Sequence, residues 1–332
     1  SRRLRRDQHA RVARELPRDD HLLLVAAGER ARTRLRPTAA DVDATGYIRK
    51  AALEGLERGQ GIEPRPWDPA RLPHFDHLLR TDPDGAWVAV ARGTVIGYSM
   101  GFTRGDIWFL AQLFVQPEVH AQGAGRELLR LAMDAGRKRG ARIFSVVSST
   151  SPVAQALYMR AGMFATGIGY RLSGPVDALV ALPEPDGEER EITPTEASLA
   201  RLERLDRDAF GASRRPEHEL YLSDAWGDDR GSGFTLERDG EAAGYGYAMR
   251  NGHIGPFAAH DPADQLALLR IAGDWLAARD IREAYGYFLT HNTTVTGALV
   301  AGGWKIHGWS FFLTTGQYGS FDRYVPGSGL LL

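Results

Sequence analysis

The residues whose types and spacing best suit a chemical role lie in one segment, Leu113 to Arg126, which predicts a strand, a short loop and the start of a helix. Glycines at positions 123 and 125 let the backbone turn its N–H groups toward a ligand, because no Cβ obstructs them. The first N–H groups of a helix have no partner within it, and the helix dipole adds positive charge there. The segment therefore predicts a cradle for a phosphate or pyrophosphate.

The spacing of these glycines excludes two other phosphate-binding loops. No third glycine follows three residues after Gly125, as a dinucleotide fingerprint requires, and the Lys-Ser/Thr pair of a nucleoside-triphosphate loop is missing. Tight packing explains a glycine pair before a helix equally well. The assignment of a ligand therefore depends on the surrounding motifs.

Composition narrows the chemistry further. The chain has no cysteine, which excludes disulfides, cysteine-bound zinc, iron–sulfur clusters and a thiolate nucleophile. A net charge of −1 argues against binding to nucleic acid or an acidic membrane through bulk charge. We expect a cytoplasmic protein without a membrane helix, because the apolar runs are short and no signal-peptide pattern opens the sequence. The histidines lie on separate elements without metal-ligand spacing, so we expect no metal site.

The elements that must position the cradle follow a regular pattern. Ala86–Ala91 and Val95–Phe102 predict a hairpin turning at Arg92-Gly93, and residues 106–115 predict a third strand. An amphipathic helix over 126–139, a buried strand over 143–147 and a helix over 152–161 follow. This order predicts an α/β (α+β) fold in which helices flank a mixed, mostly antiparallel sheet.

A repeat organises the chain of 332 residues, and about 150 residues per domain is usual. Gly244-Tyr245 echoes Gly97-Tyr98, and Val295, Leu299, Gly303 and Trp304 match Ala154, Tyr158, Gly162 and Met163 at an offset of 141 residues. We expect an Arg-rich arm over residues 1–31, a first domain over 32–176, a linker over 177–189 and a second, related domain over 190–332. The arm is expected to be solvated and partly helical, although an RNA-docking role stays open.

The motifs in register resemble the acetyl-CoA-binding segment of the GNAT superfamily of N-acetyltransferases. There an Arg or Gln stands three residues before one glycine and five before a second Gly or Ala, after a strand ending in Val-x-Pro. The pattern is carried here by His120, Gly123 and Gly125 after Val115 and Pro117. The resemblance covers about residues 33–174, with a fainter copy over 190–332. It departs from the family at His120, which replaces Arg or Gln, and at Ser151, where the family often has Asn.

The resemblance implies an enzyme that uses acetyl-CoA as cosubstrate. It places the pantetheine arm along Leu113, Phe114 and Val115 and beside Ser151, and the pyrophosphate on the backbone amides of the following loop and helix start: His120, Ala121, Gln122, Gly123, Ala124, Gly125 and Arg126. It also matches Tyr158 to the family's general acid. A phenol of pKa about 10 can protonate a departing thiolate of pKa about 8.5; a core aromatic is the alternative.

The general base stays open. The family often has Glu or Asp on the strand that here carries Ala111 and Gln112, and Gln112 cannot take a proton. Asp106, Glu54, Glu57 and His74 are candidates that spacing alone cannot separate.

The second copy is predicted to be inactive, because it lacks both glycines, gains Pro262, Asp261 and Asp264, and has Leu299 in the place of Tyr158. Completing the core or covering the cleft is the expected role, and a ligand-sensing role is the alternative.

We therefore expect transfer of acetyl from acetyl-CoA to the amine of a small molecule, by direct attack in a ternary complex. Neither nucleic acid nor membrane is an expected partner, and both a monomer and a homodimer are open. A non-catalytic acyl-CoA-binding or regulatory protein is the alternative. Chemistry of the mycothiol-synthase type is a further alternative. The resemblance would then require an intact loop in the second copy, whereas the intact loop lies in the first.

Overall fold

A computed structural model describes residues 21–25, 29–35, 39–59, 73–117 and 123–332 of the chain. The chain divides into two compact units. One contains the described residues up to Thr103 together with Trp108–Arg142, and the other contains Arg104–Ile107 and Ile143–Leu332. None of the described helices is both long and apolar enough to cross a membrane.

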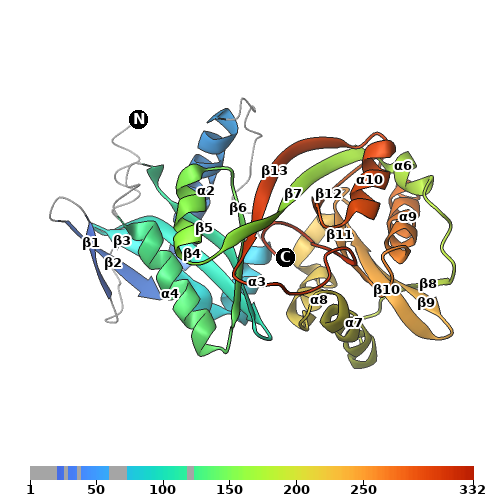
Figure 1. The fold of residues 1–332 in the computed structure, drawn as a ribbon, viewed down its shortest axis with the longest axis horizontal. Helices are drawn as coiled ribbons and strands as arrows, with labels where there is room; N and C mark the ends of the chain where they lie inside the picture. Colours follow the sequence, from blue (N-terminus) through green and yellow to red (C-terminus); the bar gives the residue numbers. More distant parts are fainter. Residues whose placement is uncertain (1–20, 26–28, 36–38, 60–72, 118–122) are drawn as a thin grey trace. The chain divides into compact units, whose positions relative to one another are not determined.

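The first unit is built on five strands that neighbour one another in chain order (Figure 1). They are β1 (His21–Val25), β2 (Glu29–Leu35), β3 (Ala86–Ala91), β4 (Thr94–Arg104) and β5 (Ile107–Val115). The helices of this unit are α2 (Ala39–Gly59), α3 (Pro73–Thr81) and α4 (Ala124–Lys138), with a short 3-10 turn at Pro83–Gly85. The predicted β3–β4 hairpin is confirmed, and Arg92 and Gly93 form its turn with φ values of 49° and 75°.

Close packing holds α4 on one face of this sheet. The Trp108 ring lies so near the helix that a Cβ on Gly136 would stand 2.4 Å from it, and Gly101 of β4 touches the same ring. Leu128 of α4 is fully buried and reaches Gly97 of β4. Small residues at these positions let the helix approach the strands, which fixes where its N-terminus lies relative to β5.

The second unit contains two groups of strands. The first group runs in the order β6 (Ile143–Ser148), β13 (Lys305–Thr314), β7 (Phe164–Pro175) and β12 (Glu283–Leu289). The other is a sheet in the order β14 (Tyr324–Val325), β11 (Ile254–Ala259), β10 (Glu241–Ala248), β9 (Ser232–Arg238) and β8 (Glu188–Glu191). Its helices are α5 (Pro152–Arg160), α6 (Val176–Val180), α7 (Glu196–Ala209), α8 (Arg215–Tyr221), α9 (Asp264–Ala277) and α10 (Thr293–Ala301), with a short 3-10 helix at Asp224–Asp229.

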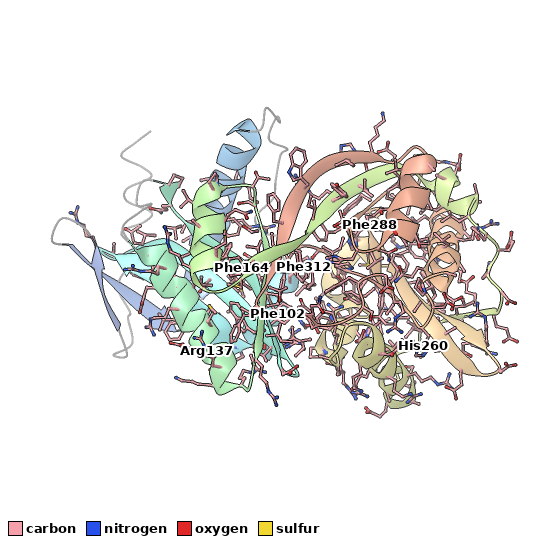
Figure 2. All side chains as sticks on the ribbon, in the orientation of Figure 1. Phe102, Arg137, Phe164, His260, Phe288 and Phe312 are labelled. Atoms are coloured by element: carbon pink, nitrogen blue, oxygen red, sulfur yellow. The ribbon has the colours of Figure 1, made fainter. Side chains whose placement is uncertain are left out.

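The strands β7 and β13 exchange places between the two repeats. β13 belongs to the second repeat in the sequence and bears the labelled Phe312 in Figure 2. It nevertheless lies between β6 and β7. β7 in turn lies between β13 and β12. Each repeat therefore supplies a strand to the other, and neither has its full set of strands alone.

The two strand–helix–strand segments repeat in three dimensions. α5 and α10 begin 141 residues apart, as do β7 and β13. The β7–β13 pairing has an irregularity at Thr166 and another at His307, and these two residues are also 141 apart. The offset of 141 residues predicted from the matching residues therefore recurs in the backbone irregularities of β7 and β13.

Two local expectations need correction. His21–Val25, assigned to a partly helical arm, is a strand paired with β2. The segment expected to be a linker contains α6, whose Val176 and Leu179 are buried in the core of the second unit.

Candidate functional site

Side chains of β5 change face part-way along the strand. Trp108 contacts α4, and Phe109 contacts Phe102 on the opposite face. Further along, Leu113 and Val115 pack with Leu128 of α4. In a regular strand, residues 108 and 113 would lie on opposite faces. The change of face between Phe109 and Leu113 therefore indicates a β-bulge, a feature frequent beside active sites.

The end of β5 is where the strand becomes accessible. Ile107 to Gln112 are buried, whereas Leu113, Phe114 and Val115 are partly exposed. Just after β5, the Gln116 backbone N–H donates a hydrogen bond of 2.8 Å to the Ile96 carbonyl of β4. Binding of pantetheine along these three residues stays a prediction.

The N-terminus of α4 has a backbone geometry that suits an anion. Gly123 precedes the helix with a φ of 90°, in the left-handed region that favours glycine, and as a glycine it brings no side chain to cap the helix. Gly123 itself therefore offers no side-chain acceptor to the first N–H groups of α4. The predicted loop residues His120, Ala121 and Gln122 lie outside the described residues, whereas Gly123, Ala124, Gly125 and Arg126 are described.

Arg126 differs from the other arginines of this helix. Arg130 forms ion pairs with Glu127 and Asp134, and Arg137 pairs with Asp134. Arg126 is exposed in the first helical turn, and no ion pair joins it to a described residue. A cation beside open backbone N–H groups suits a bound phosphate.

Ser151 and Tyr158 lie on α5 and its cap, in the second unit. Ser151 precedes the helix, and its hydroxyl makes no cap hydrogen bond. Tyr158 is 6% exposed, and burial raises the pKa of its phenol, which therefore stays protonated at neutral pH. No described residue accepts a hydrogen bond from its hydroxyl, so the proton is available to a ligand.

Gln112 occupies the strand position where a carboxylate would serve as base. Its Oε1 accepts a hydrogen bond of 2.6 Å from the Tyr98 hydroxyl, and both side chains are buried. Among the other candidate bases, Glu54 Oε1 lies 3.8 Å from Lys50 Nζ. Asp106 is a partly exposed turn residue, and its backbone carbonyl accepts a hydrogen bond from the Ile143 N–H. His74 lies on α3, and the side chain of Glu57 is outside the described residues.

In the second repeat, side chains of the protein itself contact the start of the corresponding helix, α9. α9 begins 140 residues after α4, and Leu268 contacts Gly244 as Leu128 contacts Gly97. The Arg238 guanidinium donates two hydrogen bonds, of 2.6 and 2.9 Å, to the Asp264 carboxylate in the first turn of α9. Gln265, which corresponds to Gly125, is buried and hydrogen-bonded to Asn292, the residue that caps α10.

Two of these contacts could not be predicted from the sequence. Tyr98 is recognisable through the repeated Gly-Tyr pair, but nothing local indicates that its hydroxyl meets Gln112. The Gln265–Asn292 contact likewise joins residues on different helices. Among the described residues, no cluster of three or more His, Asp or Glu side chains could hold a metal ion.

Comparison with known proteins finds a family match for part of the chain. The model of the Acetyltransferase (GNAT) family matches residues 51–163. An aminoglycoside N(6')-acetyltransferase type 1 of Salmonella enteritidis is 27% identical over 118 residues, which cover 32% of this chain and 80% of the relative.

Solved structures of low sequence identity share the fold. A GCN5-related N-acetyltransferase from Sphaerobacter thermophilus has a TM-score of 0.60 at 18% identity and covers 86% of this chain and 95% of its own. A tandem GNAT protein from the clavulanic acid biosynthesis pathway has a TM-score of 0.53 at 19% identity, with coverages of 86% and 99%. Residues 51–163 thus match the Acetyltransferase (GNAT) family, and the protein is an acyltransferase whose donor is acetyl-CoA.

Proposed function

We propose that the protein transfers acetyl from acetyl-CoA to the amine of a small molecule, and that only the first repeat binds the donor. The observation that carries this proposal is the N-terminus of α4, which follows left-handed Gly123 and has Arg126 in its first turn. These groups would hold the pyrophosphate, and Leu113 to Val115 would hold the pantetheine arm.

The reaction we propose is direct attack in a ternary complex. The neutral amine attacks the thioester carbonyl carbon, the carbon–sulfur bond breaks, and the leaving thiolate takes the proton of the Tyr158 hydroxyl. The attacking nitrogen loses one proton, and the phenolate regains one from solvent. The absence of cysteine favours direct transfer over a thioester on the enzyme.

No carboxylate is available on β5 to take the amine proton, because Gln112 stands there. We therefore propose that a water molecule accepts it. An amine with a pKa near neutral would suit such a site, because a simple alkyl ammonium of pKa about 10.4 is almost wholly protonated at pH 7. The Salmonella relative acts on an aminoglycoside, which supports an amino sugar or a similar polar amine as the acceptor.

The side-chain contacts at the start of α9 support a structural role for the second half. Asp264 places a carboxylate where a phosphate would lie, and Gln265 fills space that a glycine leaves open in the first repeat. The domain boundaries at 32–176, 177–189 and 190–332 stay proposals, as do a cytoplasmic location and a choice between monomer and homodimer.

Turnover of an amine panel tests the proposed function. The purified protein would be mixed with acetyl-CoA and, separately, with glucosamine, kanamycin, spermidine and lysine, and released CoA would be measured with a thiol reagent. Because the chain contains no cysteine, all the thiol detected comes from CoA. Amine-dependent release is the expected result. Binding of acetyl-CoA without any release would instead support the non-catalytic acyl-CoA-binding alternative.

A further inference from the structure

Gln112 has a buried hydrogen-bond donor that the protein leaves unused. Its side chain is 2% exposed, and its Nε2 has no hydrogen-bond partner among the described residues. An unsatisfied donor removed from water costs about 1–3 kcal/mol. Such a cost in the middle of a GNAT domain, on the strand beside Leu113, points to a group that meets its partner only when a ligand is bound.

Tyr98 fixes the direction in which this donor points. Its hydroxyl donates to Gln112 Oε1, so the amide oxygen is occupied and the NH₂ group is the free end. The Tyr98 ring is held between Phe75 of α3 and Phe114 of β5, with ring centroids 6.1 and 5.8 Å away. Burial raises the pKa of Tyr98, so the phenol remains a neutral donor and the orientation of the amide persists.

The surroundings of this pair favour an oxygen ligand. The Arg49 guanidinium of α2 acts electrostatically on the Tyr98 hydroxyl, which in turn bonds Gln112. An ammonium group has only donors and cannot accept a hydrogen bond from an amide NH₂. The unused donor is therefore suited to a hydroxyl or carboxylate oxygen.

We infer that Gln112 is a positioning residue whose Nε2 donates to an oxygen carried by the acceptor close to its amine. The inference rests on the proposed function and deepens it, because it restricts the acceptor to amines with a neighbouring oxygen. Amino alcohols, amino sugars and amino acids belong to this class, and simple alkyl amines do not. Tyr98 acts through Gln112 and is a positioning residue of the same pair.

A matched pair of amines tests the inference. trans-2-Aminocyclohexanol and cyclohexylamine differ by one hydroxyl beside the amine. We expect kcat/KM of the wild type to favour the amino alcohol by at least about tenfold, since a site with a buried donor rejects an analogue that cannot satisfy it. Gln112→Met keeps the length of the side chain and removes the amide, and it should bring the ratio close to one. A wild-type ratio of one would overturn the inference.

Two further variants separate positioning from stability. Tyr98→Phe removes the hydroxyl that orients the amide and should raise KM for the amino alcohol more than it lowers kcat. Tyr245→Phe is the matched control, because Tyr245 occupies the corresponding Gly-Tyr position and bonds Asp206 in the second unit. It should leave the ratio of the two amines unchanged. A change in that ratio as large as that of Tyr98→Phe would overturn the inference.

A binding measurement keeps this inference distinct from the proposed function. The NMR signals of the Gln112 carboxamide can be assigned by their loss in Gln112→Met. With CoA bound, 2-aminocyclohexanol should shift them and cyclohexylamine should not. This shift, without any turnover, would support Gln112 positioning while refuting acetyl transfer. Turnover of the amino alcohol without a shift would refute the positioning role alone.

Discussion

Gly169 of β7 lies directly opposite Ser310 of β13 in the antiparallel pairing, and the two residues are 141 positions apart in the chain. A residue that pairs with its own counterpart marks the local twofold axis of a repeat. The pairs Lys305–Ser173 and Thr314–Phe164 lie on either side of it and correspond to each other under the same offset. The two repeats are therefore joined by their most central strands.

A Cβ on Gly169 should destabilise the strands at both ends of the group, β6 and β12. In Gly169→Ala the new atom would stand 1.8 Å from the Tyr287 hydroxyl and 2.1 Å from its ring carbon, so the buried Tyr287 side chain would have to move. We expect a loss of about 1–3 kcal/mol in the free energy of unfolding. Hydrogen exchange should rise in both β6 and β12, although they lie far apart in sequence.

Gly297→Ala serves as the control for this substitution. Gly297 lies within α10, and a Cβ there would meet no atom within 4 Å. The control should leave the stability unchanged or slightly higher. If Gly169→Ala raised exchange in β12 only, the exchanged strands would not act as one cooperative unit.

Calorimetric titration of acetyl-CoA tests the number of donor sites. We expect one site per chain in the wild type and none in Gly123→Glu, because a side chain is strained at a φ of 90° and the new carboxylate would repel the pyrophosphate. The control is Ala263→Glu, before α9, where φ is −64°. It should leave the single site intact. Two sites in the wild type would show that the second repeat also binds the donor.

Tyr158→Phe tests the proposed acid. We expect kcat to fall by about 10²-fold while KM for acetyl-CoA changes little, since the hydroxyl is needed when the thiolate departs. Tyr287→Phe removes another buried hydroxyl, which bonds Ser310, and should lower stability without a comparable loss of kcat. Equal losses of kcat in the two variants would make Tyr158 a packing residue.

Stability should depend on pH through His253. Its Nε2 bonds the Gly327 carbonyl at 2.6 Å, and burial lowers the pKa of the imidazole to about 4, although the hydrogen bond opposes this shift. The unfolded state has a His pKa of about 6.5 and binds a proton that the folded state does not between these values. The free energy of unfolding should therefore fall as pH drops from about 6.5 to about 4.

Urea unfolding at pH 7 and pH 5 measures this dependence. The wild type should lose about 1–2 kcal/mol more than His253→Gln between the two pH values. The Gln side chain keeps a donor for the Gly327 carbonyl but does not titrate. Equal losses in the two proteins would assign the pH dependence to other groups.

Much of the site could be predicted because its signals are local. The glycine at 123 is needed where the backbone takes a positive φ, and the amphipathic pattern after it predicts a helix that begins within two residues of α4. The hairpin turning at Arg92-Gly93 and the helix ending at Gly162 are similarly encoded by short motifs with their own conformational reasons. The absence of cysteine excludes a thiolate nucleophile and needs no coordinates.

The tertiary structure alone decided which distant segments meet. The residue patterns of 164–175 and 305–314 predict strands but do not specify which strands they pair with. The exchange of β7 and β13 therefore depends on long-range pairing. The Tyr98–Gln112 bond and the Gln265–Asn292 contact require the packing of elements separated in the chain. Sequence patterns determine which conformation a segment adopts and which face it buries. Which residue bonds to a buried polar group depends on how the elements pack together in the tertiary structure.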